Sequence, residues 1–198
     1  MNSARSSVVV GILVVLCMVL VYWWIPTHAK EAAGQSNIPV ATVANYVHSV
    51  IEANRTFYTI HVVERLQAKG VVTAAENWRV TNTLPLPAQF LRESADLATK
   101  TGTKIDYRLI SLWPINKQNG PADDFERAGL KEVLAQQERP YTGTITRDGE
   151  RYFRAIYADR AVSQACIGCH NVHPNSPKKD FKPNDVMGGI VISIPLGQ

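Results

Sequence analysis

Cysteine is scarce in this chain: only three occur among 198 residues, and Cys17 lies inside an apolar run near the N-terminus. Cys166 and Cys169 are then the only cysteines available to a folded domain, too few for a framework of disulfides. The sequence also lacks a basic stripe with interleaved aromatic residues, so we expect no nucleic-acid partner. Because no constellation typical of a hydrolase stands out, enzymatic activity is left undecided, and electron transfer or sensing is favoured over catalysis.

The overall composition is that of a globular protein. Hydrophobic residues make up 45% and charged residues 19% of the chain, a balance that argues against extensive disorder. The formal net charge of +4 is mildly basic and is spread over the sequence without a long basic run. An ordinary solvated surface explains it better than a dedicated acidic partner.

An unbroken apolar stretch runs from Val8 to Ile25, just long enough to cross a bilayer. It ends in Tyr22, Trp23 and Trp24, which suit the membrane–water interface, and Arg5 before it favours a cytoplasmic N-terminus. We therefore expect a single-pass protein of the bacterial cytoplasmic membrane with its domain outside. The alternative is a signal peptide cleaved near Ala29.

Three segments follow from this interpretation: an anchor over residues 1–28, a polar linker over 29–39 and one domain over 40–198. Helices are expected over 40–69, over 87–101 and over 122–137, because these stretches have helical periodicity or helix-starting residues. Strands are expected over 104–113 and 189–195, with a hairpin over 141–157 turning at Asp148-Gly149. This order predicts an α+β fold with an antiparallel sheet.

The first of these helices has an amphipathic pattern. Its apolar face is predicted to point into the core and to consist of Val43, Val47, Val50, Asn54, Phe57, Tyr58 and His61. Glu52, Arg55 and Thr59 fall on the opposite, solvent side in this interpretation. His48 is also placed well away from the apolar face.

The chemistry of the chain is concentrated in Cys166-Ile167-Gly168-Cys169-His170, a C-x-x-C-H motif typical of c-type haem attachment. Two thiols at this spacing reach the two vinyl groups of one haem, and the adjacent histidine binds the iron. We expect one covalent haem c, held by Cys166 and Cys169 with His170 as the proximal ligand. A zinc site that adds His173, or a redox-active cysteine pair, are the alternatives.

The chain resembles a family of exported c-type haem domains with a PAS-like fold, long described as a domain of unknown function. Members occur alone and in front of bacterial sensor kinases and cyclases. The resemblance covers residues 40–197 and is carried by these segments: Arg55 with Tyr58-Thr59 and Val62-Val63, residues 84–88, residues 107–116, residues 123–126, residues 166–171, His173-Pro174, residues 176–180 and Asp185-Val186 with Gly188. It implies a PAS-like antiparallel sheet with a long N-terminal helix.

Three positions depart from the family pattern, which commonly has Trp, Gly and Arg where this chain has Phe181, Asn184 and Met187. A missing arginine would remove a partner for a haem propionate. The family also includes members with a ligating cysteine on the first helix, and this chain has none there. The sixth iron ligand is therefore not given by the motif.

Several side chains are candidates for that sixth position. His61 is preferred because it is predicted to point into the core, and Met187 is the alternative because it is the only methionine after the apolar run. His173 and His48 are weaker candidates, and an iron open to a small gas is also considered.

Two functions remain open from the sequence. The first is a membrane-anchored monohaem cytochrome that carries single electrons outside the membrane, working with a redox partner protein or as a subunit of a respiratory complex. The second is a redox or gas sensor, for NO, CO or O2, that acts through a separate partner. A second copy of the chain is a further candidate partner.

Overall fold

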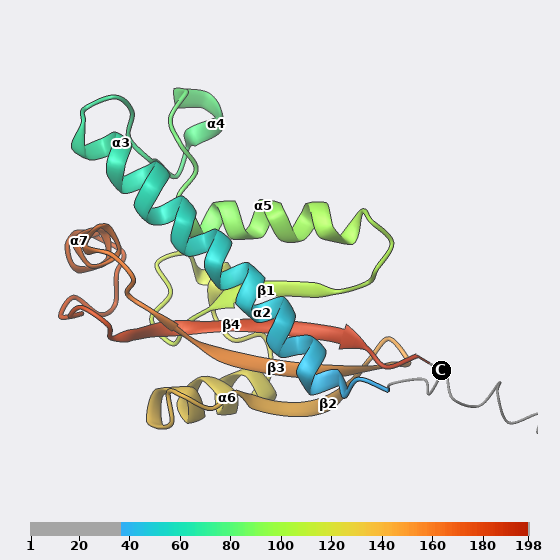
Figure 1. Ribbon diagram of the computed structural model, residues 1–198. Coiled ribbons are helices and arrows are strands. Elements are labelled where there is room, and N and C mark those ends of the chain that lie inside the picture. Colours follow the sequence, from blue (N-terminus) through green and yellow to red (C-terminus); the bar gives the residue numbers. More distant parts are fainter. Residues whose placement is uncertain (1–36, 198) are drawn as a thin grey trace, which may run out of the picture. The chain divides into compact units, whose positions relative to one another are not determined.

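A long helix opens the part of the chain that the computed structural model describes, residues 37–197 (Figure 1). It consists of α2 (Val40–Phe57), the π-helical segment η2 (Tyr58–Glu64) and α3 (Arg65–Ala68). Gly70 follows with a φ of 66°, a left-handed conformation that glycine adopts without strain and that commonly ends a helix. The helix predicted over 40–69 is thus confirmed, but the π-helical segment within it was not foreseen.

The predicted membrane anchor over 1–28, including Val8–Ile25, and most of the linker over 29–39 lie outside the described residues. Among residues 37–197, no helix has both the length and the apolar composition needed to cross a membrane.

The remaining helices are shorter, and α5 and α6 pack against a sheet. They are α4 (Trp78–Thr81), α5 (Pro87–Thr99), the 3-10 helix η3 (Lys117–Asn119), α6 (Asp124–Ala135) and α7 (Gln164–Val172). Pro87 stands at the start of α5, where its missing N–H costs no hydrogen bond. The Asp123 side chain accepts a hydrogen bond from the Glu126 N–H (2.8 Å) and so caps α6 at its N-terminus. The helices predicted around α5 and α6 are therefore present, with slightly shorter bounds.

The sheet has four strands in the order β1-β4-β3-β2, and every neighbouring pair is antiparallel. The strands are β1 (Asp106–Ile110), β2 (Tyr141–Arg147), β3 (Glu150–Arg160) and β4 (Val186–Pro195). Asp148 (φ 52°) and Gly149 (φ 77°) form the predicted tight turn between β2 and β3. The α+β fold with an antiparallel sheet is confirmed.

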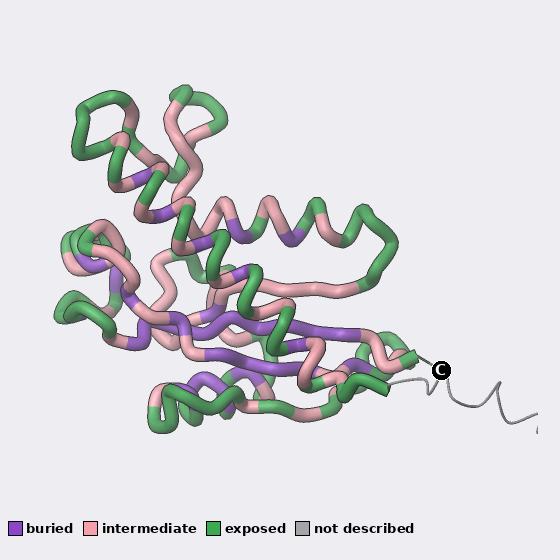
Figure 2. The backbone as a smooth tube through the Cα atoms, in the orientation of Figure 1, coloured by how far each residue is buried: buried purple, intermediate pink, exposed green. Residues whose placement is uncertain are grey.

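Each face of the sheet carries its own buried cluster. Side chains such as Ala155, Ile190 and Ile192 pack against α2 and α5, whereas their neighbours Ile156 and Val191 pack against α6. This alternation follows the two-residue period of a strand. Figure 2 shows that β3 and β4 are buried along most of their length.

The buried face of the long helix is not the one that the hydrophobic pattern predicted. Its buried residues are Ala44, Ile51, Arg55, Thr59 and Val63. Within the predicted apolar face, Val43 and Val47 do pack against the core, but other members point to solvent. Val50 and Phe57 are each 61% exposed, and Asn54 and His61 are exposed as well. The prediction was wrong because a buried arginine occupies the centre of the true inner face.

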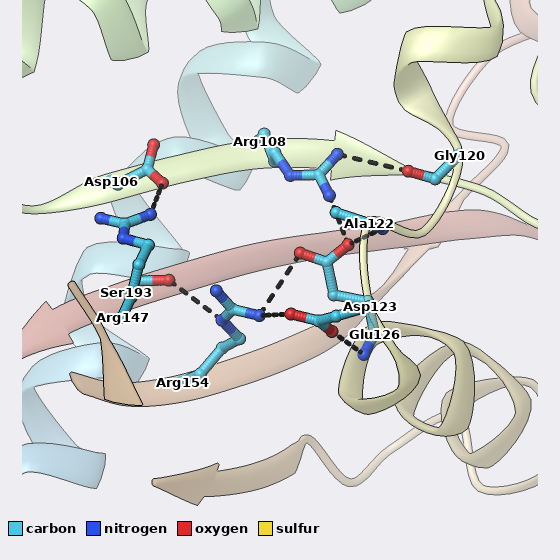
Figure 3. Close-up of polar contacts among 9 residues, drawn as sticks. All are labelled: Asp106, Arg108, Gly120, Ala122, Asp123, Glu126, Arg147, Arg154 and Ser193. Carbon is cyan, nitrogen blue, oxygen red and sulfur yellow. Dashed lines mark hydrogen bonds and ion pairs between the residues drawn. The ribbon is translucent and has the colours of Figure 1, made fainter. Parts of the chain in front are cut away.

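The opposite face of the sheet holds a buried carboxylate between two arginines (Figure 3). Glu126 is 2% exposed; it pairs with Arg108, lies 3.6 Å from Arg154 and accepts a hydrogen bond from the Ala122 N–H (2.7 Å). Arg154 also pairs with Asp123 (2.6 Å). This network joins α6 to β1 and β3 by charge as well as by apolar packing.

Replacing Glu126 by alanine should lower the free energy of unfolding by about 3–5 kcal/mol, because two arginines would lose a buried counter-charge. The control is Glu132→Ala on the exposed side of the same helix, where a change within about 0.5 kcal/mol is expected. Urea unfolding of the full chain in detergent, followed by circular dichroism, measures both. Equal losses in the two variants would contradict a special role for Glu126.

Candidate functional site

The C-x-x-C-H motif forms part of α7. Cys166, Cys169 and His170 stand at helical spacings of three and four residues, so all three side chains project from one face of the helix. Both thiols are free, and the Cys166 sulfur lies 3.6 Å from the hydroxyl of Ser163. The described residues thus bring the three predicted ligands of a haem together, although the helix that does so was not predicted.

Two hydrogen bonds join the loop after α7 to the residue that follows the motif. The Asn171 amide donates to the Phe181 carbonyl (2.9 Å), and its oxygen accepts from the Phe181 N–H (3.0 Å). The ring of Phe181 then meets His170 edge-on, with centroids 5.8 Å apart, and Trp113 at 5.9 Å. Aromatic surface therefore lies directly beside the histidine of the motif.

His170 has the properties that a histidine needs to bind a metal ion. Its Nδ1 is buried and makes no hydrogen bond within the described part of the chain. Burial, followed by the charge of His173, lowers the pKa of His170, which keeps the imidazole neutral and able to bind a metal. A c-type haem would use this residue together with the two thiols of the same helix face.

The two alternative interpretations of the motif find less support. Burial, and then the charge of Cys166, raises the pKa of Cys169, whereas redox-active thiols need a lowered one. His173, the fourth member of the zinc alternative, turns away to Glu76, with 3.4 Å between Nε2 and Oε1. Among residues 37–197, no group of three or more His, Cys, Asp or Glu side chains is arranged to hold a metal ion.

A buried ion pair lies next to the motif. Arg55, on the inner face of α2, pairs with Asp159 near the end of β3, and both residues are about 5% exposed or less. Glu52 lies 3.7 Å from the same guanidinium. Burial alone would lower the pKa of Arg55, but Asp159, Glu52 and then Cys166 raise it, so the guanidinium stays charged. The Arg55 guanidinium also donates to the Arg160 carbonyl (3.4 Å), and the next residue, Ala161, belongs to the cluster against which Cys166 packs.

His48 lies on the same side of α2 and stacks on Tyr157 with ring centroids 3.9 Å apart. Burial and the positive charge of Arg55 lower its pKa to about 4, so it is neutral at physiological pH. The expectation that His48 faces away from the core is therefore wrong. Among the described residues, the buried polar side-chain atoms without a hydrogen-bond partner are His48 Nε2, Glu52 Oε2, Arg55 Nε and His170 Nδ1. Three of the four belong to this face of α2.

The two predicted candidates for the sixth iron ligand lie in different surroundings. His61, in η2, is exposed and contacts the ring of Phe57 at 4.9 Å, so its expected position in the core is wrong. Met187, at the start of β4, is 7% exposed and packs with Ile167 and Phe181 in a cluster that Cys166 also contacts. The structure thus brings Met187, and not His61, into the packing of the motif.

Asn184, one of the positions that depart from the family pattern, has a φ of 67°. This left-handed conformation favours glycine, and asparagine is among the few other residues that tolerate it. Asn184 therefore stands at a backbone position that would also suit glycine.

These observations define an α+β domain in which the helix after the third strand of the sheet carries a C-x-x-C-H motif with an exposed cysteine. The model of the Tll0287-like family matches residues 29–195, and the chain belongs to that family. A solved structure of the cyanobacterial haem protein Tll0287 is 14% identical with a TM-score of 0.40, over 57% of this chain and 74% of that one. No curated protein matches the chain.

Replacing Arg55 by leucine should leave the Asp159 carboxylate buried without its partner and cost about 3–5 kcal/mol of the free energy of unfolding at neutral pH. Burial raises the pKa of Asp159 above its unfolded value, and Arg55 opposes this. In the variant the native state therefore binds the proton more tightly than the unfolded state, so the lost stability should return as the pH falls toward the ordinary aspartate pKa.

The double variant with Asp159→Asn should regain most of that stability at neutral pH, because no buried charge is left over. Arg79→Leu is the control, since Arg79 forms an exposed pair with Glu93. Urea unfolding at several pH values measures all three variants. A loss in Arg55→Leu that is independent of pH would show that the pair contributes packing and not charge.

Proposed function

We propose that this chain is a membrane-anchored monohaem c-type cytochrome that carries single electrons on the outer side of the bacterial cytoplasmic membrane. The observation that carries the proposal is the shared helix face of Cys166, Cys169 and His170 beside an aromatic and apolar cluster. Membership of the Tll0287-like family, whose namesake is a haem protein, supports a haem-binding domain. A c-type haem supplies a one-electron Fe(III)/Fe(II) couple when it is bound.

The residues of this chain would perform three tasks for that group. Cys166 and Cys169 would hold it by thioether bonds, and His170 would ligate the iron from the same helix. Phe181 and Trp113 would exclude water on one side of the site, because they already pack there. Arg55 would place a positive charge near the motif, where it offsets the charges of the carboxylates around it.

Anchoring and partners complete the proposal. The apolar run Val8–Ile25 would hold the domain at the membrane, outside the cytoplasm, and a redox partner protein or a respiratory complex would exchange electrons with it. A redox or gas sensor is the second candidate. The π-helical segment η2 agrees with either function, because such segments are uncommon and often mark functional sites.

Covalent attachment is the direct test of the haem proposal. The purified full chain, denatured on a gel, should keep its haem stain, and its mass should exceed that of the chain by one haem. The double variant Cys166→Ala with Cys169→Ala should lose both signals, whereas Cys17→Ser, outside the motif, should keep them. Extraction of all haem from the wild-type protein by acid acetone would show that the haem is not covalent.

The sixth ligand separates an electron carrier from a gas sensor. Of the two predicted ligands the packing favours Met187, and an electron carrier should have a low-spin iron that binds CO poorly. Met187→Leu should then give a high-spin iron that binds CO, while His61→Ala leaves the visible spectrum unchanged. The reverse result would return the role to His61, and a wild-type protein that binds CO rapidly would favour the sensor.

A further inference from the structure

One side of α2 carries three ionisable side chains in a row. His48, Glu52 and Arg55 follow one another at spacings of four and three residues, which makes neighbouring members adjacent on a helix. Each has a buried polar atom that makes no hydrogen bond within the described part of the chain. The row faces β3, because His48 stacks on Tyr157 and Arg55 pairs with Asp159; Figure 1 shows α2 lying across this strand. An ionisable row is thus enclosed between helix and sheet.

The charges in this row do not balance. Two carboxylates share one guanidinium, because Asp159 pairs with Arg55 and Glu52 lies 3.7 Å from the same Nη2 atom. His48 adds no positive charge, because burial and then Arg55 lower its pKa to about 4. One negative charge is therefore left over, and it belongs to Glu52, whose Oε2 has no partner among the described residues.

The elements packed against α2 do not supply the missing positive charge. The strand β4 contains no charged residue. On β3, the guanidinium of Arg160 pairs with Glu138 (2.5 Å). On α5, Arg92 and Asp96 are exposed and Glu93 pairs with Arg79 (2.5 Å), and in η2 His61 is exposed. The charged groups that act on Glu52 are therefore Arg55 from its own helix and Asp159 from β3.

Glu52 is also placed to exchange a proton with water. Its side chain is 30% exposed although Oε2 is buried, whereas that of Asp159 is 8% exposed. Burial, the largest influence, raises the pKa of Glu52, Arg55 lowers it and Asp159 raises it again. Burial raises the pKa of Asp159 as well, but Asp159 has the closer contact with the guanidinium. Of the two carboxylates, Glu52 is therefore the one that binds a proton first.

The row ends close to the C-x-x-C-H motif. The Arg55 guanidinium donates to the Arg160 carbonyl (3.4 Å), and Ala161 belongs to the cluster against which Cys166 packs. A change of charge on a group held by α7 would act on this row partly through protein, where charges interact more strongly than in bulk water. An additional negative charge there would tighten the binding of a proton by a carboxylate nearby.

We propose that Glu52 binds one proton from water when the haem iron is reduced and releases it when the iron is oxidised. The inference rests on the proposed function. The redox partner supplies the electron that converts Fe(III) to Fe(II), and water supplies the proton that converts the carboxylate of Glu52 to a carboxylic acid. Oxidation returns both, so the chain would carry a proton together with each electron.

The first test is the midpoint potential of the full-length holoprotein in detergent, measured by spectroelectrochemical titration from about pH 4 to about pH 9. Reduction should tighten proton binding at Glu52 about tenfold, so the potential should fall by about 59 mV as the pH rises through the titration of this residue. Glu52→Gln should lose this fall, because its amide binds no proton. Glu64→Gln, twelve residues further along the same helix, is the control and should keep it.

Asp159→Asn tests the electrostatic origin of the effect. The asparagine removes the competing carboxylate and leaves the Arg55 guanidinium to Glu52, which lowers the pKa of Glu52. The fall in potential should therefore move to lower pH in this variant and should not disappear. Its disappearance would assign the proton to Asp159 and overturn the assignment to Glu52.

Infrared difference spectra between the reduced and oxidised protein give a second readout, because they detect the carboxyl group itself. Reduction should produce the carbonyl band of a protonated carboxyl group, which shifts in D2O and is missing in Glu52→Gln. A potential that is independent of pH, a Glu52→Gln variant that keeps the fall, or spectra without this band would each overturn the inference while the covalent haem stain remains. Loss of the stain itself would overturn the cytochrome proposal as well.

Discussion

The buried pair between Arg55 and Asp159 is the interaction on which the arrangement of this domain depends. A charged arginine inside a protein is tolerated only when a carboxylate neutralises it, so α2 has one rotation that satisfies Arg55. That rotation places Ala44 and Ile51 on the sheet and turns Val50 and Phe57 outward. Since Asp159 stands at the end of β3, the same contact sets the helix against the strand that leads into the motif.

Local contacts then define the geometry of the site within that frame. Asn171 and Phe181 close the loop after α7 by two hydrogen bonds, and Phe181 brings its ring to His170. Tyr58, at the start of η2, stacks on Phe90 of α5 and donates a hydrogen bond to the Pro85 carbonyl (2.7 Å), which holds the long helix against α5. The face of α7 that carries Cys166 and Cys169 stays open to a ligand, since Cys169 is exposed and Cys166 is half-buried.

The sequence allowed the fold class, most element bounds and the motif to be predicted, because each depends on neighbours in the chain. Periodicity predicted the helices and Asp148-Gly149 predicted the hairpin, as the structure has them, whereas the haem attachment predicted from the cysteine spacing stays a prediction. The inner face of α2 could not be predicted from the sequence, because Arg55 is buried against Asp159, which lies 104 positions away in the chain. Prediction from a hydrophobic pattern treats arginine as a solvent-facing residue. The predicted buried face of α2 was therefore the wrong one, and the predicted positions of His61 and His48 were wrong as well.

Other features were hidden for related reasons. The π-helical segment η2 depends on its packing, and the residues Tyr58–Glu64 contain no pattern that predicts it. Within the structure, the Thr59 hydroxyl donates a hydrogen bond to the Arg55 carbonyl (2.7 Å), a kind of bond that often bends helices. The packing of Met187 with Cys166 depends on the return of β4 to the end of the sheet. Such a contact requires the topology and not the sequence alone.

The length of α2 has a mechanical consequence. From Val40 to Arg55 the helix rises roughly 22 Å at the standard 1.5 Å per residue. Whatever is attached ahead of Val40 is therefore separated from the neighbourhood of Cys166 by a stiff rod. Any change of charge at the motif that reaches the chain ahead of Val40 along this route must travel as a tilt, a rotation or a sliding of that rod. Arg55, which pairs with Asp159 near the end of β3, is the contact about which the helix would move.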